Sequence, residues 1–370
     1  MNEEVFIRNK FREYYSNNKI EGPRDISARE FGFGSWKKKI ETRHYSFSDN
    51  RALNAFLVRN VPFFISYSIA FYRYPSARPM EKKEWLWGEL VFDIDANELE
   101  FPCTDKHGKE WVCEKCMEGT KESVFRLIDD FLTRDFAVDE REIEVNFSGN
   151  RGYHVHLMAG YESIGGYARK EIADYVNGTG LDYDHLFEKV GEKVVGPKLG
   201  DGGWKGRIAK TFVRLARERK LDKLISKRVA SKFYDDDIIR EIANGNWERV
   251  YISNRKKFFT GVIEKIRRMY GCYVDEQVTM DTSKLIRLPD SIHGGTGMIA
   301  MRIKDIDSFD PFSDPVIFGK NEMKVFVEKS PEFILKGETY GPFENEEVVL
   351  PEYAAIYLIC KGVAKLIDRF

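Results

Sequence analysis

Short apolar segments dominate the first 160 residues of the chain and predict β-strands. The β-forming run at 89–95 ends in two aspartates, Asp93 and Asp95. Apolar and polar residues alternate at 143–147 and again at 153–158, and a turn bounded by two glycines separates these two segments. Strands interspersed with helical stretches over 370 residues are typical of an α/β or mixed α+β protein with one large domain or two smaller ones.

The pattern changes in the middle of the chain. Between 165 and 247 the strand signals vanish, and apolar residues recur at helical spacing around 208–216, with glycines at the flanks. We therefore expect a helical insertion at 165–247 within a core formed by 1–164 and 248–345. The closing segment 346–370 is apolar at helical spacing from Tyr353 to Ile367 and is expected to pack on the core as a helix.

Charge and composition exclude some classes of protein. The 59 Lys and Arg residues nearly balance the 60 Asp and Glu residues, so any contact with nucleic acid must come from local clusters of basic residues. The longest apolar run, 61–72, is too short to span a membrane, and the charged N-terminus lacks a signal-peptide core. These features predict an intracellular, cytoplasmic protein.

Asp93 and Asp95 lie two positions apart on a predicted strand, so both carboxylates point to one face, about 7 Å apart along the backbone. Two like charges on one face are unfavourable without a cation. A pair of divalent ions would neutralise them and could clamp the attacking and leaving oxygens of a phosphoryl transfer. Taken alone the motif is weak, because an Asp-x-Asp at a strand end is more often solvated.

The glycine-bounded turn after the strand at 143–147 carries groups that suit a triphosphate. Two glycines let the backbone approach a phosphate, Ser148 offers a hydroxyl, Arg151 offers a bidentate fork and His154 can donate from the returning strand. An ordinary polar hairpin turn is the alternative interpretation.

Three cysteines and a histidine follow the aspartate pair within fourteen residues. Cys103, His107, Cys113 and Cys116 form a ligand set with a CxxC knuckle, which predicts tetrahedral Zn²⁺ in a loop at 102–118. Four protein ligands leave no open position, so the zinc would be structural. Free thiols, a redox pair or a knuckle that has lost its metal are the alternatives.

A late segment, 273–297, brings acidic, basic and glycine residues in succession. Arg287 and His293 are suited to meet negative charge, and either Asp275 or Asp281 could complete a three-carboxylate site with Asp93 and Asp95. A surface helix with ordinary ion pairs is the alternative. Spacing in the sequence does not decide between the two aspartates.

These segments, in their order along the chain, resemble the motifs of the archaeal/eukaryotic-type DNA primase small (catalytic) subunit family. The resemblance rests on 91–95, the Cys/His loop, 148–154 and 285–293, and on weaker blocks at 29–33, 43–47 and 351–354. It implies a mixed α/β primase-type catalytic core with a helical insertion and a small zinc-binding loop.

The resemblance also assigns residues to roles. Asp93, Asp95 and, in preference to Asp281, Asp275 match the family's catalytic metal ligands, for two Mg²⁺ or Mn²⁺ ions. Glu30 and Arg43 match neighbours of the active site. The matches to nucleotide-phosphate contacts are Ser148, Arg151, His154, Arg287 and His293. His107 stands where eukaryotic members carry a cysteine, a substitution that zinc accepts.

The implied activity is synthesis of short primers, of RNA alone or of both RNA and DNA, on single-stranded DNA during replication by two-metal nucleotidyl transfer. The implied partners are a primase large subunit, the single-stranded template and nucleoside triphosphates, with no membrane. Two alternatives stay open: a primase-polymerase relative that acts in repair or damage bypass, and a non-catalytic, zinc-stabilised DNA-binding subunit.

Overall fold

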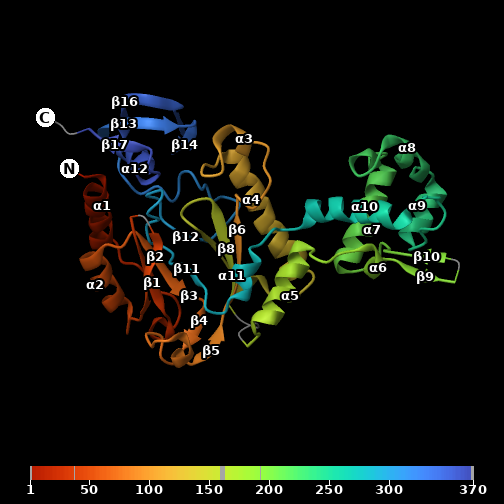
Figure 1. The fold of residues 1–370 in the computed structure, drawn as a ribbon, viewed down its shortest axis with the longest axis horizontal. Coiled ribbons are helices and arrows are strands. Elements are labelled where there is room, and N and C mark those ends of the chain that lie inside the picture. The colour runs from red at the N-terminus through yellow and green to blue at the C-terminus, as the bar shows by residue number, and fades with distance from the viewer. Residues whose placement is uncertain (1, 37, 159–162, 192, 368–370) are drawn as a thin grey trace. The chain divides into compact units, whose positions relative to one another are not determined.

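The computed structural model describes residues 2–36, 38–158, 163–191 and 193–367 and has a mixed α+β architecture, as the sequence predicts (Figure 1). The chain divides into two compact units. The larger unit contains 1–124, 139–170 and 274–370, and the smaller contains 125–138 and 171–273. Among the described residues, no helix has both the length and the apolar composition needed to cross a lipid bilayer.

Two four-stranded sheets form the centre of the larger unit, and their strands combine segments far apart in the sequence. The first sheet has the order β11-β3-β1-β2, with all neighbours antiparallel. Its strands are β1 (Phe31–Ser35), β2 (Lys38–Tyr45), β3 (Phe64–Ser68) and β11 (Leu285–Arg287). Every residue of β3 is buried, which explains its continuous run of β-forming residues.

The second sheet has the order β12-β7-β8-β6 and is also antiparallel. Its strands are β6 (Leu90–Asp95), β7 (Ile143–Phe147), β8 (Gly152–Leu157) and β12 (Met301–Ile303). β7 and β8 form the hairpin expected from the sequence. On the other side of β8, Asp93 stands opposite His154, and Asp95 stands opposite Gly152. The pairing therefore sets the aspartate pair beside the glycine turn.

Helices and small sheets complete the larger unit. Its helices are α1 (Glu3–Asn17), α2 (Asn50–Asn60), α3 (Thr104–His107), α11 (Glu276–Met280) and α12 (Glu352–Cys360). Two further helices, α4 (Glu114–Arg126) and α5 (Gly166–Asn177), begin in this unit and continue into the smaller one. The small sheets pair β4 (Ala70–Tyr72) with β5 (Trp85–Gly88) and β14 (Phe333–Leu335) with β15 (Glu338–Tyr340).

The C-terminal segment is not the purely helical one that its apolar spacing suggested. A three-stranded sheet of order β16-β13-β17 packs against α12. Its strands are β13 (Glu322–Ser330), β16 (Phe343–Pro351) and β17 (Ala364–Leu366). The helix ends at Cys360 because the chain turns at Gly362, where φ is +75°, and pairs with β13. Almost all of α12 is buried, so its apolar residues do not mark a single helical face.

The smaller unit is mainly helical, with its own apolar core around Phe212, Trp247 and Phe259. Its helices are α6 (Tyr183–Leu186), α7 (Gly203–Arg217), α8 (Lys227–Ala230), α9 (Asp236–Ala243) and α10 (Arg255–Tyr270). It also contains a two-stranded antiparallel sheet of β9 (Glu188–Val190) and β10 (Lys193–Val195), which the sequence pattern does not predict because both strands are short and exposed. The unit extends beyond the insertion expected at 165–247, since α10 buries Phe259 and Ile263 in this core.

Candidate active site and metal centre

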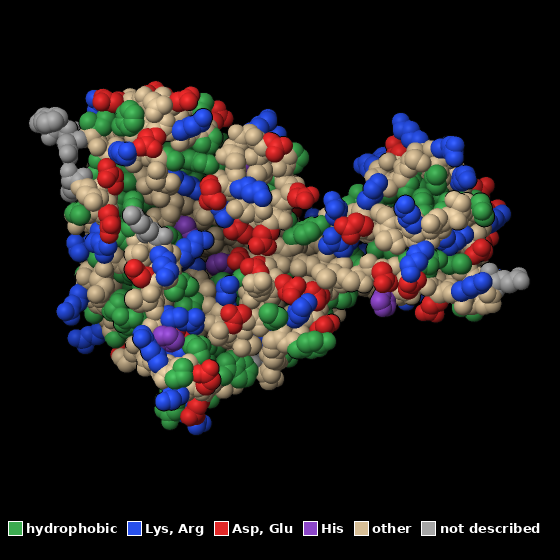
Figure 2. Space-filling view, viewed as in Figure 1, with side chains coloured by type: hydrophobic (Ala, Val, Ile, Leu, Met, Phe, Trp, Pro, Cys, Tyr) green, Lys and Arg blue, Asp and Glu red, His purple; other side chains and the backbone are tan. Residues whose placement is uncertain are grey.

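A cavity of about 280 Å³ opens in the larger unit where the two central sheets meet α11. Seven of the predicted site residues line it: Asp93, Asp95, Ser148, His154, Asp275, Arg287 and His293. On the face drawn in Figure 2, histidine side chains lie in a hollow beside acidic and basic ones. Segments separated by almost 200 residues of sequence thus contribute acidic and cationic groups to one cavity.

The acidic side of the cavity joins β6 to the start of α11. The backbone N–H of Asp275 donates to the carbonyl oxygen of Asp93 at 3.0 Å. Asp275 is also the N-cap of α11, and its carboxylate accepts from the backbone N–H groups of Gln277 and Val278. Asp281 lies at the other end of α11, does not line the cavity, and accepts from Ser283.

The carboxylates are close enough to repel one another. Burial, followed by the negative charges of Asp95, Glu98 and Asp275, raises the pKa of Asp93 to about 7. Glu98 was not identified from the sequence, because its place beside Asp275 depends on the turn that follows β6. Divalent cations suit such a group of oxygen ligands. Among the described residues, the group found with potential metal-ligand atoms all within 4.8 Å of one another is the Cys/His set.

Arg151 reaches from the glycine turn to the acidic group. Its Nε donates to Asp95 at 2.9 Å, and its Nη1 donates to the Glu110 carboxylate at 3.2 Å. The guanidinium is mostly buried, with its side chain 14% exposed. It does not line the cavity but stands beside it, held between Asp95 and the Cys/His loop.

The glycine turn packs closely against the late segment. Gly149 has φ +82°, and a Cβ there would lie 2.9 Å from the Cβ of His293, so a side chain would displace His293. Thr296 Oγ1 donates to the Gly149 carbonyl at 2.6 Å. In the turn itself, Ser148 Oγ accepts from the Gly152 N–H at 3.2 Å. The turn is thus fixed to the segment that carries His293.

Burial favours the neutral form of both histidines in the cavity. Burial, with smaller contributions from His156 and Arg287, lowers the pKa of His154 to about 3. Burial and then Arg287 lower the pKa of His293 well below its usual range. His293 Nδ1 accepts from the Gly295 N–H at 3.2 Å, which leaves its proton on Nε2 for donation to a ligand. His154 Nε2 lies 3.7 Å from an Asp93 carboxylate oxygen.

Further cations approach the same cavity. Arg287 lies with its guanidinium 5.0 Å from the Phe64 ring centre, and burial lowers its pKa to about 10, so it stays charged. Lys284 and Lys39 line the cavity as well. Lys39 was not predicted, because a lysine on an exposed edge strand has no distinguishing signal in the sequence.

Glu30 and Arg43 lie outside the cavity lining, one contact away from it. Glu30 is fully buried, and Arg43 binds it through two hydrogen bonds of 2.8 and 3.1 Å. Burial opposes ionisation of Glu30, but the Arg43 hydrogen bonds and charge hold the pKa of Glu30 below its usual value. Arg43 also donates to the carbonyl of Ser283 at 3.4 Å, which is the residue before Lys284. This pair therefore supports the strand that leads into the cavity wall.

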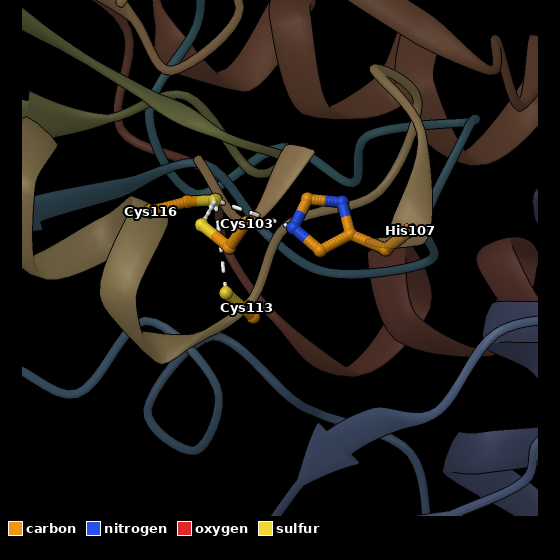
Figure 3. A group of neighbouring side chains, drawn as sticks. All are labelled: Cys103, His107, Cys113 and Cys116. Atoms are coloured by element: carbon orange, nitrogen blue, oxygen red, sulfur yellow. Dashed lines mark hydrogen bonds between the residues drawn. The ribbon is translucent and has the colours of Figure 1, made fainter. Parts of the chain in front are cut away.

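The four predicted zinc ligands converge on a common centre (Figure 3). Cys116 Sγ lies 3.2 Å from Cys103 Sγ, 3.7 Å from Cys113 Sγ and 3.4 Å from His107 Nε2. A tetrahedral zinc with Zn–S bonds of about 2.3 Å separates its ligand atoms by about 3.8 Å. The donor set and spacing therefore fit zinc.

The local structure favours a thiolate at Cys113, whereas burial raises the pKa of the neighbouring Cys116 thiol. Burial opposes ionisation of Cys113, but hydrogen bonds from the Cys116 amide and from neighbouring side chains lower the pKa of Cys113 to about 7. Cys113 directly precedes α4, whose N-terminus stabilises negative charge. The Cys/His cluster could therefore bind zinc at neutral pH.

The chain is similar in sequence to a family of known proteins and to several named relatives. Residues 92–304 match the model of the family described as DNA primase small subunit. The chain is 33% identical to the DNA primase small subunit PriS of Methanococcoides burtonii, and the match covers 97% of both chains. It is 33% identical to the protein of that name from Archaeoglobus fulgidus, over 97% of this chain and 98% of the relative. A relative of the same name from Nitrosopumilus maritimus is 29% identical over 98% of both chains. The chain therefore belongs to the DNA primase small subunit family.

Proposed function

We propose that this chain is the catalytic subunit of a DNA primase that synthesises short primers, of RNA alone or of both RNA and DNA, on single-stranded DNA for replication. The observation that carries the proposal is the cavity in which Asp93, Asp95 and Asp275 face His154, Arg287 and His293. Family membership adds a second argument, since primases make new strands from nucleoside triphosphates. A protein with this function works where replication exposes single-stranded DNA, inside the cell.

The acidic side of the cavity is suited to hold divalent metal. Asp93, Asp95 and Asp275 would bind two Mg²⁺ or Mn²⁺ ions, and the crowding that raises the pKa of Asp93 is relieved when cations neutralise these carboxylates. When bound, such ions activate a 3′-hydroxyl and stabilise negative charge at the reacting phosphate. Asp275 is our choice for the third ligand because its backbone is bonded to that of Asp93.

The opposite side of the cavity would hold the triphosphate. Arg287 and Lys284 supply positive charge, and His293 and His154 supply neutral donors. Ser148 and Arg151 would add a hydroxyl and a guanidinium fork from the glycine turn. These groups orient the α-phosphate toward an attacking hydroxyl and stabilise pyrophosphate as it leaves.

Glu30 and Arg43 would act by holding the Ser283–Lys284 backbone in place, and the Cys/His loop would hold structural zinc. We further propose that the chain works with a primase large subunit, as the word "small subunit" in the names of its relatives implies.

A template-dependent synthesis assay tests this function. The chain is incubated with single-stranded DNA, Mg²⁺ or Mn²⁺ and labelled nucleotides, without any primer, and ribonucleotides are compared with deoxynucleotides. We expect new strands from the wild-type chain and none from Asp95→Asn. Asp139→Asn is the matched control, because Asp139 is an exposed aspartate paired with Arg141 outside the cavity.

Other outcomes would favour the alternatives. Extension of existing 3′ ends without new starts would indicate a primase-polymerase relative of repair. DNA binding with no incorporation under any metal condition would indicate a non-catalytic subunit.

A further inference from the structure

Lys361 connects three parts of the larger unit that are distant in sequence. It follows α12, and its Nζ donates to the backbone carbonyl of Glu110 at 2.7 Å. The same atom lies 3.4 Å from Oδ1 of Asn150 in the glycine turn. Lys361 lies outside the stretch 92–304 that matches the family model, and no motif in the sequence points to it.

Two aromatic rings hold the ammonium group of Lys361 in place. Nζ lies 5.4 Å from the ring centre of Trp111 and 5.5 Å from that of Tyr357. Trp111 in turn packs against Tyr357 and Phe333, each at 5.8 Å between ring centres. A partly desolvated ammonium over aromatic faces has a defined position rather than the mobility of a surface lysine.

The residues that Lys361 binds also hold Arg151. Arg151 Nη1 contacts the Glu110 carboxylate at 3.2 Å and the Lys109 carbonyl at 3.4 Å. Arg151 follows Asn150 directly in the chain. The guanidinium of Arg151 is thus held by Asp95 on one side and by Lys109 and Glu110 of the Cys/His loop on the other. Lys361 is hydrogen-bonded to the same loop and to Asn150, the residue before Arg151.

Charged groups in three segments of the chain act on the ammonium group of Lys361. Glu110, on the Cys/His loop, and Asp95, at the end of β6, attract it, whereas Arg151 repels it. Burial and then Arg151 lower the pKa of Lys361 to about 8, so the group stays mostly protonated near neutral pH. The two cations therefore share Glu110, one through its backbone carbonyl and the other through its carboxylate.

We propose that Lys361 is a positioning residue of the nucleotide site, which fixes segment 109–111 and Asn150 so that Arg151 presents its guanidinium to the triphosphate. The proposal rests on the proposed function, since it assumes that Arg151 binds nucleotide. It assigns a role in nucleotide binding to the C-terminal segment, which contributes no lining residue of its own and reaches the cavity through Asn150.

Nucleotide binding by the full-length chain tests the proposal. The probe is a ribose-labelled fluorescent ATP analogue in the presence of Mn²⁺, and the KM for nucleotide and kcat are measured in parallel. We expect Lys361→Met to weaken binding and raise KM by about tenfold, the effect of losing one charged hydrogen bond, with kcat little changed. The matched control is Lys365→Met, because Lys365 pairs with Glu328 on the exposed surface of the same segment and should have wild-type affinity.

A double-mutant cycle separates positioning from general stabilisation. If Lys361 acts through Arg151, then Lys361→Met should weaken binding no further in a chain that already carries Arg151→Gln. A further loss of similar size in that background would overturn the proposal, as would an unchanged affinity of Lys361→Met. Should the Met variant fail to fold, Lys361→Gln replaces it. Its polar end is too short to reach both acceptors, so wild-type affinity in that variant would also contradict the proposal.

The proposed function and this inference fail in different ways. A wild-type chain that binds no analogue and makes no primers would overturn both. A wild-type chain that binds and primes, with a Lys361→Met variant of equal affinity, would overturn the inference alone.

Discussion

The backbone N–H of Asp275 donates to the backbone carbonyl of Asp93 at 3.0 Å, although the two residues lie in distant parts of the chain. The bond joins the start of α11 to the end of β6. Because it is formed by backbone atoms alone, it keeps the two residues close together whatever side chains they carry. A substitution at either position can therefore change the charge of the cavity without removing the bond that holds its two walls together.

Asp275 and Asp281 provide a matched pair of substitutions at the two ends of α11. Asp275→Asn should reduce primer synthesis by at least about a hundredfold, the usual effect of removing one group that stabilises transition-state charge. Asp281→Asn should retain most activity, because its side chain accepts from Ser283 and does not line the cavity. Initial rates of nucleotide incorporation at saturating Mn²⁺ measure both. The reverse ranking would assign the third carboxylate to Asp281.

The stability of the metal-free protein should decrease as pH rises, because of the raised pKa of Asp93. Its pKa in the folded chain, about 7, is raised above the ordinary value of 3.8, so between these values the folded state binds more protons than the unfolded state. Stability must then fall as pH rises through this window, by up to about 4 kcal/mol before screening. Asp93→Asn should lack this loss and should be more stable than the wild type at pH 8 without metal.

Thermal unfolding of the two proteins from pH 5 to pH 8 in the presence of a chelator measures the difference. Addition of Mg²⁺ or Mn²⁺ at pH 8 should stabilise the wild type and leave Asp93→Asn nearly unchanged. Equal pH profiles for the two chains would show that the carboxylates do not repel one another as the structure indicates.

The Cys/His cluster predicts a structural metal. Double substitution of Cys113 and Cys116 by Ser should abolish zinc binding, measured by metal analysis of the purified chain, and should lower the Tm. The matched control is Cys272→Ser, since Cys272 is buried away from the cluster and its pKa is raised by burial. That variant should lose some stability but no zinc. Full zinc content in the double variant would contradict the ligand assignment.

A buried ion pair between the residues that precede β1 and β6 predicts a large effect on stability. The Arg29 guanidinium is bonded to the Glu89 carboxylate, and both side chains are almost fully buried. Glu89→Gln would leave the Arg29 charge uncompensated and should cost about 3–5 kcal/mol of unfolding free energy. Glu84→Gln breaks the exposed Arg73–Glu84 pair and should cost less than about 1 kcal/mol. Urea unfolding followed by circular dichroism compares the two.

Several features were determined by the sequence alone, because they depend on neighbours along the chain. The strand that ends in Asp93 and Asp95, the hairpin around the glycine turn and the helix at 203–217 follow from local periodicity. The Cys/His set was equally readable, since its four ligands lie within fourteen residues and the chain needs only a short loop to bring them together. Groups of side chains that lie close together in the sequence can thus be identified from the spacing of their residues.

Only the tertiary structure decided which distant groups meet. Packing between separate elements brings Asp275, and not Asp281, to the backbone of Asp93. It also places Arg151 between Asp95 and Glu110, and it brings Lys361 close to Asn150. The apolar spacing near the C-terminus predicted a helix as far as Ile367, but α12 ends earlier and β17 follows it, because β13 offers an edge for pairing. Local propensity is weak compared with the free energy of burying apolar surface and satisfying backbone hydrogen bonds, and those contributions are fixed by the whole fold.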